Sequence, residues 1–339
     1  MPTMNGIACA GNWIVDQIKI IDCWPEQGAL STIRSLQYGI GGSPANVLTD
    51  LQSLGFSAPT IALGCIGDDQ YGRLVTEHCQ THGIDASMIR VLPGESTSYT
   101  DVMTIADSGR RTFFHDRGAN ARFIPEHVDM DRVSSLAPRI FHLGYLLLLD
   151  GMDAEDEEYG TVAARLLAGI QSRGIQTSVD VVSEAVDRFA RIVGPALNYV
   201  DHCIVNEYEA ERITGIKARD SDEAIIRPAL VEAARALLTM GVSRTAVIHC
   251  PEGGQWIDPT GADVWVPSLH LPEGMVVSAV GAGDAFCAGA LYGIHEGWPP
   301  EQCLTVANAT AAMSLCAKNT TDGVRSLDEV LEFSAAHQP

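Results

Sequence analysis

Residues 278–286, SAVGAGDAF, combine small residues and a carboxylate in a way that suits chemistry on an anion. Gly281, Ala282 and Gly283 precede an apolar run that we expect to form a helix. Three small side chains leave backbone N–H groups uncovered at the helix start, where the helix dipole attracts an anion. Because like charges repel, Asp284 suits a base that takes a proton from an attacking hydroxyl better than a ligand of that anion. The plainer alternative is a Gly-rich turn that only starts a helix.

A second motif lies near the start of the chain. The pair Gly41-Gly42 and then Asn46 precede an apolar, helix-like run that Gly55 closes. This combination resembles the first signature of the ribokinase-like (PfkB) carbohydrate kinase family, and residues 281–284 resemble the second signature of that family. The resemblance extends from about residue 6 to about residue 332. It implies an α/β fold, namely a ribokinase-like three-layer sandwich with a mostly parallel central sheet and a small β-sheet lid.

The order of the predicted elements agrees with that fold class. Strand-like and helix-like runs alternate along most of the chain, which indicates a parallel sheet with helices on both faces. No linker divides the chain, so we expect a single kinase domain over residues 1–339. The resemblance assigns the α/β core to residues 1–13, 41–95 and 118–339, and the lid to residues 14–40 and 96–117. By analogy with the family, such a lid excludes water and often forms homodimers.

The residues of the expected acceptor site lie within the first 120 positions of the chain. Asp16 follows the first predicted strand and matches the sugar-binding Asp of the family, although an exposed strand Asp is the plainer interpretation. Asn120 ends a Gly-Ala-Asn run that resembles the hinge of the lid. The resemblance therefore implies that the substrate is bound by Asp16, Gly41, Gly42, Asn46 and Asn120.

Asn206 and Glu209 directly follow a predicted strand and resemble the Asn-x-x-Glu motif that arranges magnesium and phosphate in the family. The same pair also fits a capping box, with Asn206 as N-cap and Glu209 at N3. Because Mg²⁺ keeps several waters, we expect Glu209 to act on the metal through water. The nucleotide contacts implied by the resemblance are Asn206, Gly253, Gly283 and Asn308.

Two departures from the family pattern concern the nucleotide side. His249-Cys250-Pro251 stand where the family prefers Thr-x-Gly, which leaves contacts from this segment open. Ser278 stands where the family usually has an Asp that helps to hold a monovalent cation, and this makes potassium activation doubtful. Neither a P-loop nor a dinucleotide-binding glycine motif is present, which disfavours those two enzyme classes.

Composition excludes several other classes. The formal net charge of −21 argues against binding nucleic acid or an anionic membrane surface through a general field. The sequence has no run of about 18 apolar residues and no signal-peptide pattern, so we expect no membrane span and a cytoplasmic protein. The nine cysteines are scattered without a C-x-x-C pair, which indicates reduced, buried thiols.

Together these features predict an ATP- and Mg²⁺-dependent kinase that phosphorylates a hydroxyl of a small unphosphorylated sugar. Asp284 is the expected base, and the backbone of Gly281, Ala282 and Gly283 is the expected anion hole. A nucleoside kinase is the alternative within the family, with aromatic lid residues such as Phe113 around the base. A non-catalytic sugar- or nucleotide-sensing protein on the same fold is the alternative from another class.

Overall fold

The protein is described here by a computed structural model, which covers residues 4–338. The strands of its main sheet are β1 (Ile7–Gly11), β4 (Thr60–Gly67), β5 (Asp85–Leu92), β8 (Ile140–Leu146), β11 (Gln176–Val181), β12 (His202–Asn206), β13 (Thr245–Cys250), β14 (Gly253–Ile257) and β15 (Asp263–Pro267). They lie in the order β15-β14-β13-β12-β11-β8-β1-β4-β5. The pairs from β13 to β5 are parallel, and β14 and β15 add an antiparallel edge. The predicted mostly parallel sheet is therefore confirmed.

Helices cover both faces of this sheet because its strands are apolar on both faces. In β1, Ala8 and Ala10 pack into one core cluster, whereas Ile7 and Cys9 pack into the other, as the two-residue period of a strand requires. One face is covered by α1 (Ser43–Ser53), α2 (Gln70–Thr81), α9 (Ala282–Glu296) and α10 (Pro300–Ser314). The opposite face is covered by α3 (Met130–Leu136), α5 (Val162–Gln171), α6 (Phe189–Leu197), α7 (Glu207–Thr214) and α8 (Arg227–Thr239).

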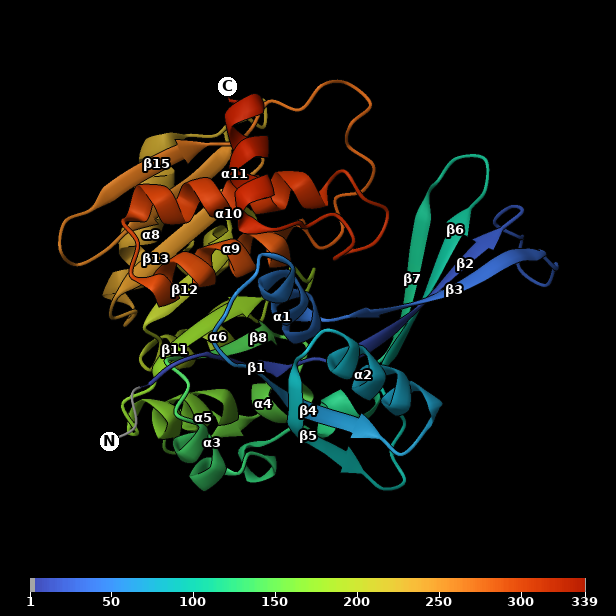
Figure 1. Ribbon diagram of the computed structural model, residues 1–339, viewed down its shortest axis with the longest axis horizontal. Helices are drawn as coiled ribbons and strands as arrows, with labels where there is room; N and C mark the ends of the chain where they lie inside the picture. Colours follow the sequence, from blue (N-terminus) through green and yellow to red (C-terminus); the bar gives the residue numbers. More distant parts are fainter. Residues whose placement is uncertain (1–3, 339) are drawn as a thin grey trace.

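A second, smaller sheet projects away from the core (Figure 1). Its strands are β2 (Ile14–Ile21), β3 (Ile33–Gly41), β6 (Tyr99–Ile105) and β7 (Arg111–Asp116), in the order β3-β2-β6-β7. The pair β2–β6 is parallel, and the other two pairs are antiparallel. The two segments predicted for the lid, 14–40 and 96–117, therefore do pair into one sheet. We call this sheet the lid.

The remaining elements are short or lie at the C-terminal end. They are the 3₁₀ turns Gly118–Arg122 and Pro125–His127, α4 (Asp150–Asp153), the two-residue strands β9 (Glu155–Asp156) and β10 (Gly160–Thr161), and α11 (Leu327–Ala336). Within residues 4–338, none of the helices is long and apolar enough to cross a membrane. All nine cysteines are free thiols, and seven of them are buried, in agreement with the sequence interpretation.

Candidate active site

The turn before α9 has the conformation that its small residues predict. Gly281 is the N-cap of α9 and has φ 85°, a left-handed value that favours glycine. A Cβ at this position would also lie 2.9 Å from the side chain of Thr320. Ala282 and Gly283 form the first turn, and the Gly283 backbone is exposed. The first amides of a helix lack intrahelical partners, so this turn presents N–H groups to an anion.

Asp284 lies in the same first turn but is buried, with only 4% of its surface exposed. Its Oδ2 accepts hydrogen bonds from Asn46 Nδ2 at 2.7 Å and from the Tyr145 hydroxyl at 2.8 Å. Burial, together with the negative charge of Asp180, raises the pKa of Asp284 to about 7. A carboxylate with a pKa near neutrality is a stronger base than an ordinary aspartate and is still ionised in part at pH 7.

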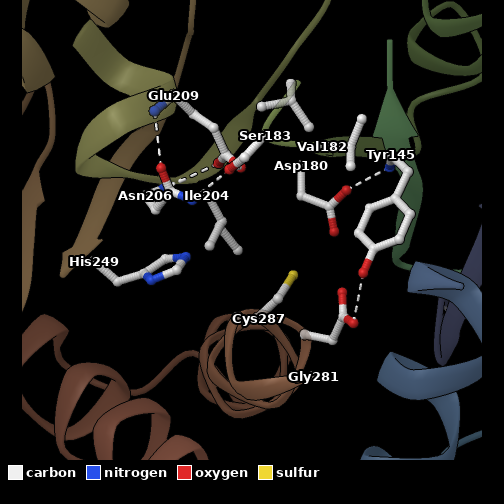
Figure 2. Close-up of a pocket in the computed structure, with 13 residues that line it drawn as sticks. Tyr145, Asp180, Val182, Ser183, Ile204, Asn206, Glu209, His249, Gly281 and Cys287 are labelled. Carbon is white, nitrogen blue, oxygen red and sulfur yellow. Dashed lines mark hydrogen bonds between the residues drawn. The ribbon is translucent and has the colours of Figure 1, made fainter. Parts of the chain in front are cut away.

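Asp180 is the second carboxylate of this region, and its place at the end of β11 follows the rule for parallel sheets. Its Oδ2 accepts a hydrogen bond from the Ser43 hydroxyl at 2.7 Å, and His142 Nε2 lies 3.3 Å from the same atom. Its Oδ1 accepts a hydrogen bond from the backbone N–H of Tyr145 (Figure 2). Tyr145 thus connects the two carboxylates, from its backbone to Asp180 and from its hydroxyl to Asp284.

Sequence reasoning did not single out Tyr145 or Ser43. Tyr145 has φ 56°, which is unusual for a residue other than glycine, and this backbone turn directs its ring to Asp284. No local sequence signal distinguishes such a tyrosine from an ordinary residue near a strand end. Asp180 was recognisable from the sequence as a residue at the strand ends where ligands bind, but its position alone assigned it no role.

These groups border a cavity of about 240 Å³, which we call the catalytic cavity; it is lined by Tyr145, Asp180, Val181, Val182, Ser183, Ile204, Asn206, Glu209, His249, Gly281, Gly283, Asp284 and Cys287. Asn206 and Glu209 form the predicted capping box of α7, with Glu209 N–H to Asn206 Oδ1 at 2.8 Å and Asn206 N–H to Glu209 Oε2 at 2.9 Å. Ser183 donates a further hydrogen bond to Glu209 Oε1 at 2.7 Å.

The catalytic cavity has the composition of a divalent-cation site. Its described lining contains three carboxyl groups and no lysine or arginine. Burial, with further contributions from Asp180 and Asp284, raises the pKa of Glu209 to about 8. A dication among these groups would relieve their repulsion, and carboxylate oxygens are ligands that Mg²⁺ prefers. The donor set therefore fits magnesium.

A larger cavity of about 530 Å³ adjoins the catalytic cavity and shares Asn206, His249 and Gly283 with it. We call it the apolar cavity; its further lining includes Leu269, Leu271, Val276, Ala282, Phe286, Asn308 and Leu315. His249 stacks on Phe286 with ring centroids 4.7 Å apart, and burial lowers the pKa of His249 to about 4, so the ring is neutral. An apolar space beside an anion-binding turn suits a nucleotide base.

The third cavity, of about 230 Å³, lies between the lid and two loops of the core, one before α9 and one after α10. We call it the lid cavity; it is lined by Asp16, Ile18, Ile20, Ser35, Gln37, Gly39, Ile40, Val102, Thr104, Arg111, Phe113, Val280, Lys318, Asn319 and Thr320. Burial raises the pKa of Asp16 to about 6. Gly41 touches this carboxylate, since a Cβ there would lie 2.7 Å from Asp16 Oδ2.

The structure links the first signature to the base. Gly42 has φ 93° and caps α1, where a Cβ would lie 2.0 Å from the backbone oxygen of Asn12. One turn later Asn46 bonds Asp284. The predicted residues Asp16, Gly41, Gly42 and Asn46 therefore form a continuous path from the lid cavity to Asp284.

Two predicted ligand contacts lie outside both this path and the described linings of the three cavities. Asn120 is fully buried, and its amide exchanges hydrogen bonds with the backbone of Trp13, at 3.2 Å to Trp13 N and 3.0 Å to Trp13 O. Gly253 begins β14, lies against the backbone of Val266 and is not in the described lining of the three cavities. Their positions do not support direct contact with substrate or nucleotide. Packing between neighbouring chain segments explains both residues.

One further side-chain cluster has ligand types that suit a metal. His142, Asp180 and Cys287 offer atoms within 4.8 Å of one another, and all three are buried. His142 Nδ1 lies 3.1 Å from the Ser178 hydroxyl, and Asp180 is held by Ser43 and Tyr145. Hydrogen bonds within the protein therefore already explain this cluster.

With the fold and the site described, comparison with known proteins places the chain in a family. The family model for pfkB family carbohydrate kinases matches residues 6–327, and the chain belongs to this family. It is therefore a kinase that uses an alcohol group as acceptor.

Individual relatives are distant but nearly full-length. An ATP-dependent ribose-1-phosphate kinase from Halopiger xanaduensis is 26% identical over 89% of this chain and 88% of its own length. A nucleoside kinase from Methanocaldococcus jannaschii is 22% identical over 99% of this chain and 98% of its own length. The structure of Arabidopsis thaliana ribokinase with ribose and ATP superposes with a TM-score of 0.79 at 22% identity, and covers 98% of this chain and 99% of that one. The ribokinase-like fold is thus established.

Proposed function

We propose that the protein is an ATP-dependent kinase that transfers the γ-phosphoryl group to a hydroxyl of a small sugar. The observation that carries the proposal is the position of Asp284. Its buried carboxylate has a pKa near 7 and lies in the helix turn that presents free backbone N–H groups. A base and an anion site one residue apart are what phosphoryl transfer to an alcohol requires.

Each group has a distinct role in this reaction. Asp284 accepts the proton of the attacking hydroxyl, and the Asn46 and Tyr145 bonds hold its carboxylate in one orientation. The backbone of Gly281, Ala282 and Gly283 receives the negative charge that develops on the transferred group. The proton leaves the hydroxyl as the new oxygen–phosphorus bond forms, and the bond to the nucleoside diphosphate breaks.

The apolar cavity is the proposed site of the nucleotide base, with Asn206, Gly283 and Asn308 in its lining. Asn308 donates a hydrogen bond to the backbone oxygen of Val266 at 2.9 Å, which fixes the edge of the cavity. Glu209, with Asp180 nearby, would hold magnesium through water. When bound, magnesium supplies charge compensation for the nucleotide phosphates.

The lid cavity is the proposed acceptor site. Its volume of about 230 Å³ lies below the roughly 300–1,000 Å³ typical of sites for drug-sized ligands, which favours a monosaccharide. A nucleoside remains the second candidate, because Ile18, Val102 and Phe113 give this cavity an apolar wall that would suit a base.

The lid and core segments predicted from sequence are proposed as one kinase domain, in which the lid covers the acceptor. A homodimer through the lid is also a proposal. It is supported by large apolar side chains exposed on the lid strands, among them Leu36, Tyr38 and Phe114.

An ATP turnover assay across neutral sugars, sugar phosphates, sugar acids and nucleosides tests the proposal. We expect turnover with at least one sugar and complete loss when magnesium is chelated. Replacing potassium by a non-coordinating cation should have little effect because of Ser278. Turnover with nucleosides alone would favour the second candidate, and ligand binding without turnover would favour a sensing protein.

A further inference from the structure

We propose that the acceptor carries an anionic group, a phosphate or a carboxylate, and that Arg111 and Lys318 bind this group in the lid cavity. The inference rests on the proposed kinase function and names the substrate class more narrowly. It departs from the unphosphorylated sugar expected from sequence.

The two cations come from opposite walls of the lid cavity. Arg111 begins β7 of the lid, and Lys318 lies in the loop that follows α10. Arg111 Nη1 lies 3.4 Å from the Ser278 hydroxyl, so the guanidinium reaches across from the lid to the loop before Gly281. Thr320, two residues after Lys318, packs directly against Gly281. Both cations therefore face the space beside the proposed phosphoryl-transfer turn.

Neither cation has a protein counter-ion in the described part of the chain. Eleven of the 22 lysines and arginines form ion pairs within residues 4–338, including Lys19 of the lid with Asp101. Arg111 and Lys318, which are both exposed, belong to the half that form none. The chain has a net charge of −21 and only three lysines. What sets these two cations apart is that they line the same cavity of a strongly acidic protein, and this placement indicates an anionic ligand.

The only carboxylate in the described lining of the lid cavity is Asp16, and the cations do not compensate its charge. Burial raises the pKa of Asp16 to about 6, whereas a cation in contact would lower it. The cavity thus has a carboxylate at Asp16 that can accept hydrogen bonds from hydroxyl groups, and two cations at Arg111 and Lys318. A sugar with one anionic end matches both features, because arginine binds phosphate and carboxylate through paired N–H groups.

A simpler role for Arg111 would be to hold the lid against Ser278 in every complex. That role affects all acceptors alike, whereas an anion subsite affects only charged ones. The test therefore measures kcat/KM for matched probes: ribose, ribose 1-phosphate, ribose 5-phosphate and ribonate, with fructose and its 1- and 6-phosphates as a second series. The phosphate and carboxylate members separate the two sources of negative charge.

We expect an anionic member of each series to have a higher kcat/KM than its neutral counterpart. Arg111→Ala or Lys318→Ala should reduce this ratio about 10- to 100-fold. Arg111→Lys should restore part of it, since the charge remains. Arg110→Ala is the matched control, because Arg110 is the neighbouring exposed arginine and lies outside the described lining. The Arg110→Ala variant should prefer anionic over neutral acceptors to the same extent as the wild type.

Titration calorimetry of the same probes with Asp284→Asn provides a readout without turnover. If an anionic probe binds more tightly than its neutral counterpart, and Arg111→Ala in the Asp284→Asn background abolishes this difference, the subsite is supported. If the wild type also transfers no phosphate to any probe, only the proposed kinase function is contradicted. The proposal is overturned if no anionic probe binds or reacts better than its neutral counterpart. It is also overturned if Arg111→Ala and Lys318→Ala lower kcat/KM equally for neutral and anionic acceptors.

Discussion

The catalytic cavity and the lid cavity hold their carboxylates in different ways. Asp284 receives two side-chain hydrogen bonds from α1 and from the end of β8, and it is buried within the core. Asp16 lies on a strand of the thin lid, and it is only partly buried. The lid strand β7 is exposed along its whole length, and Phe113 is 55% exposed.

This difference indicates that the core and the lid have separate roles in the reaction. Groups fixed by a packed core keep their geometry without ligand, which is what a base and an anion hole require. A sheet that packs on one side can shift relative to the core, so acceptor binding depends on where the lid lies. We therefore expect changes in the catalytic cavity to affect kcat, and changes in the lid cavity to affect acceptor KM.

The largest effect is expected for Asp284→Asn, which keeps the shape of the side chain and removes the base. Turnover should fall about 10²–10⁴-fold, the usual contribution of a general base. Binding of ATP, measured by calorimetry, should persist because the apolar cavity is untouched. Asp222→Asn, in an exposed loop, is the control. Near-normal turnover of Asp284→Asn would rule out its assignment as the base.

The lid counterpart is Asp16→Ala. Loss of a carboxylate that accepts hydrogen bonds from substrate hydroxyls should raise the acceptor KM about 10- to 100-fold. The KM for ATP should stay within error, since the two cavities share no described lining residue. Asp107→Ala, at the exposed tip of the lid, is the control. An unchanged acceptor KM would mean that Asp16 is an ordinary strand residue.

Tyr145→Phe tests whether the hydrogen bond from the Tyr145 hydroxyl sets the pKa of Asp284. The Tyr145 hydrogen bond favours the ionised form and lowers the pKa of Asp284, so its removal should raise that pKa above about 7. Because the base acts when ionised, the acidic limb of the kcat profile should move to higher pH, by about one unit. At pH 7 the ionised fraction of Asp284 should fall from about one half to about one tenth, so turnover should fall about 5-fold.

Tyr292→Phe is the matched control, since Tyr292 is on the same helix as Asp284 and outside the three described linings. Its profile should coincide with that of the wild type. A lower kcat for Tyr145→Phe with an unmoved acidic limb would show that Tyr145 only supports packing.

The smallest effect on turnover is expected for Asp50→Asn. Asp50 lies on α1, one turn after Asn46; it is fully buried, and neither carboxyl oxygen has a hydrogen-bond partner in the described chain. Burial, together with the charge of Asp284, raises the pKa of Asp50 well above its usual value. The folded protein then keeps a proton that the unfolded chain releases, so the free energy of unfolding falls as pH rises above about 4.

Asn does not titrate, so this part of the pH dependence should disappear in the variant. As pH rises, the free energy of unfolding of Asp50→Asn should therefore increase relative to that of the wild type, by up to about 1.4 kcal/mol per pH unit. Urea unfolding at pH 5 and pH 8 measures it. Parallel pH slopes for the two proteins would contradict a protonated Asp50.

Features that depend on neighbours in the chain were predictable from sequence. The turn at Gly281, the first-turn position of Asp284 and the capping box of Asn206 and Glu209 all follow from interactions over three or four residues. The two segments that pair into the lid sheet, 14–40 and 96–117, were also predicted, from the resemblance to a family. Resemblance to a family added the roles of these residues, since local pattern alone assigns no substrate.

Contacts across the fold were decided only by the tertiary structure. Asn46 and Asp284 are 238 residues apart, and Tyr145 joins Asp284 to Asp180 only because β8 and β11 are neighbours in the sheet. Asn120 looked like a substrate ligand but bonds the backbone of Trp13. Residue spacing along the chain does not encode strand order, and strand order determines which side chains meet at the edge of a sheet. The pairing of lid and core that brings Arg111 to Ser278 has the same origin.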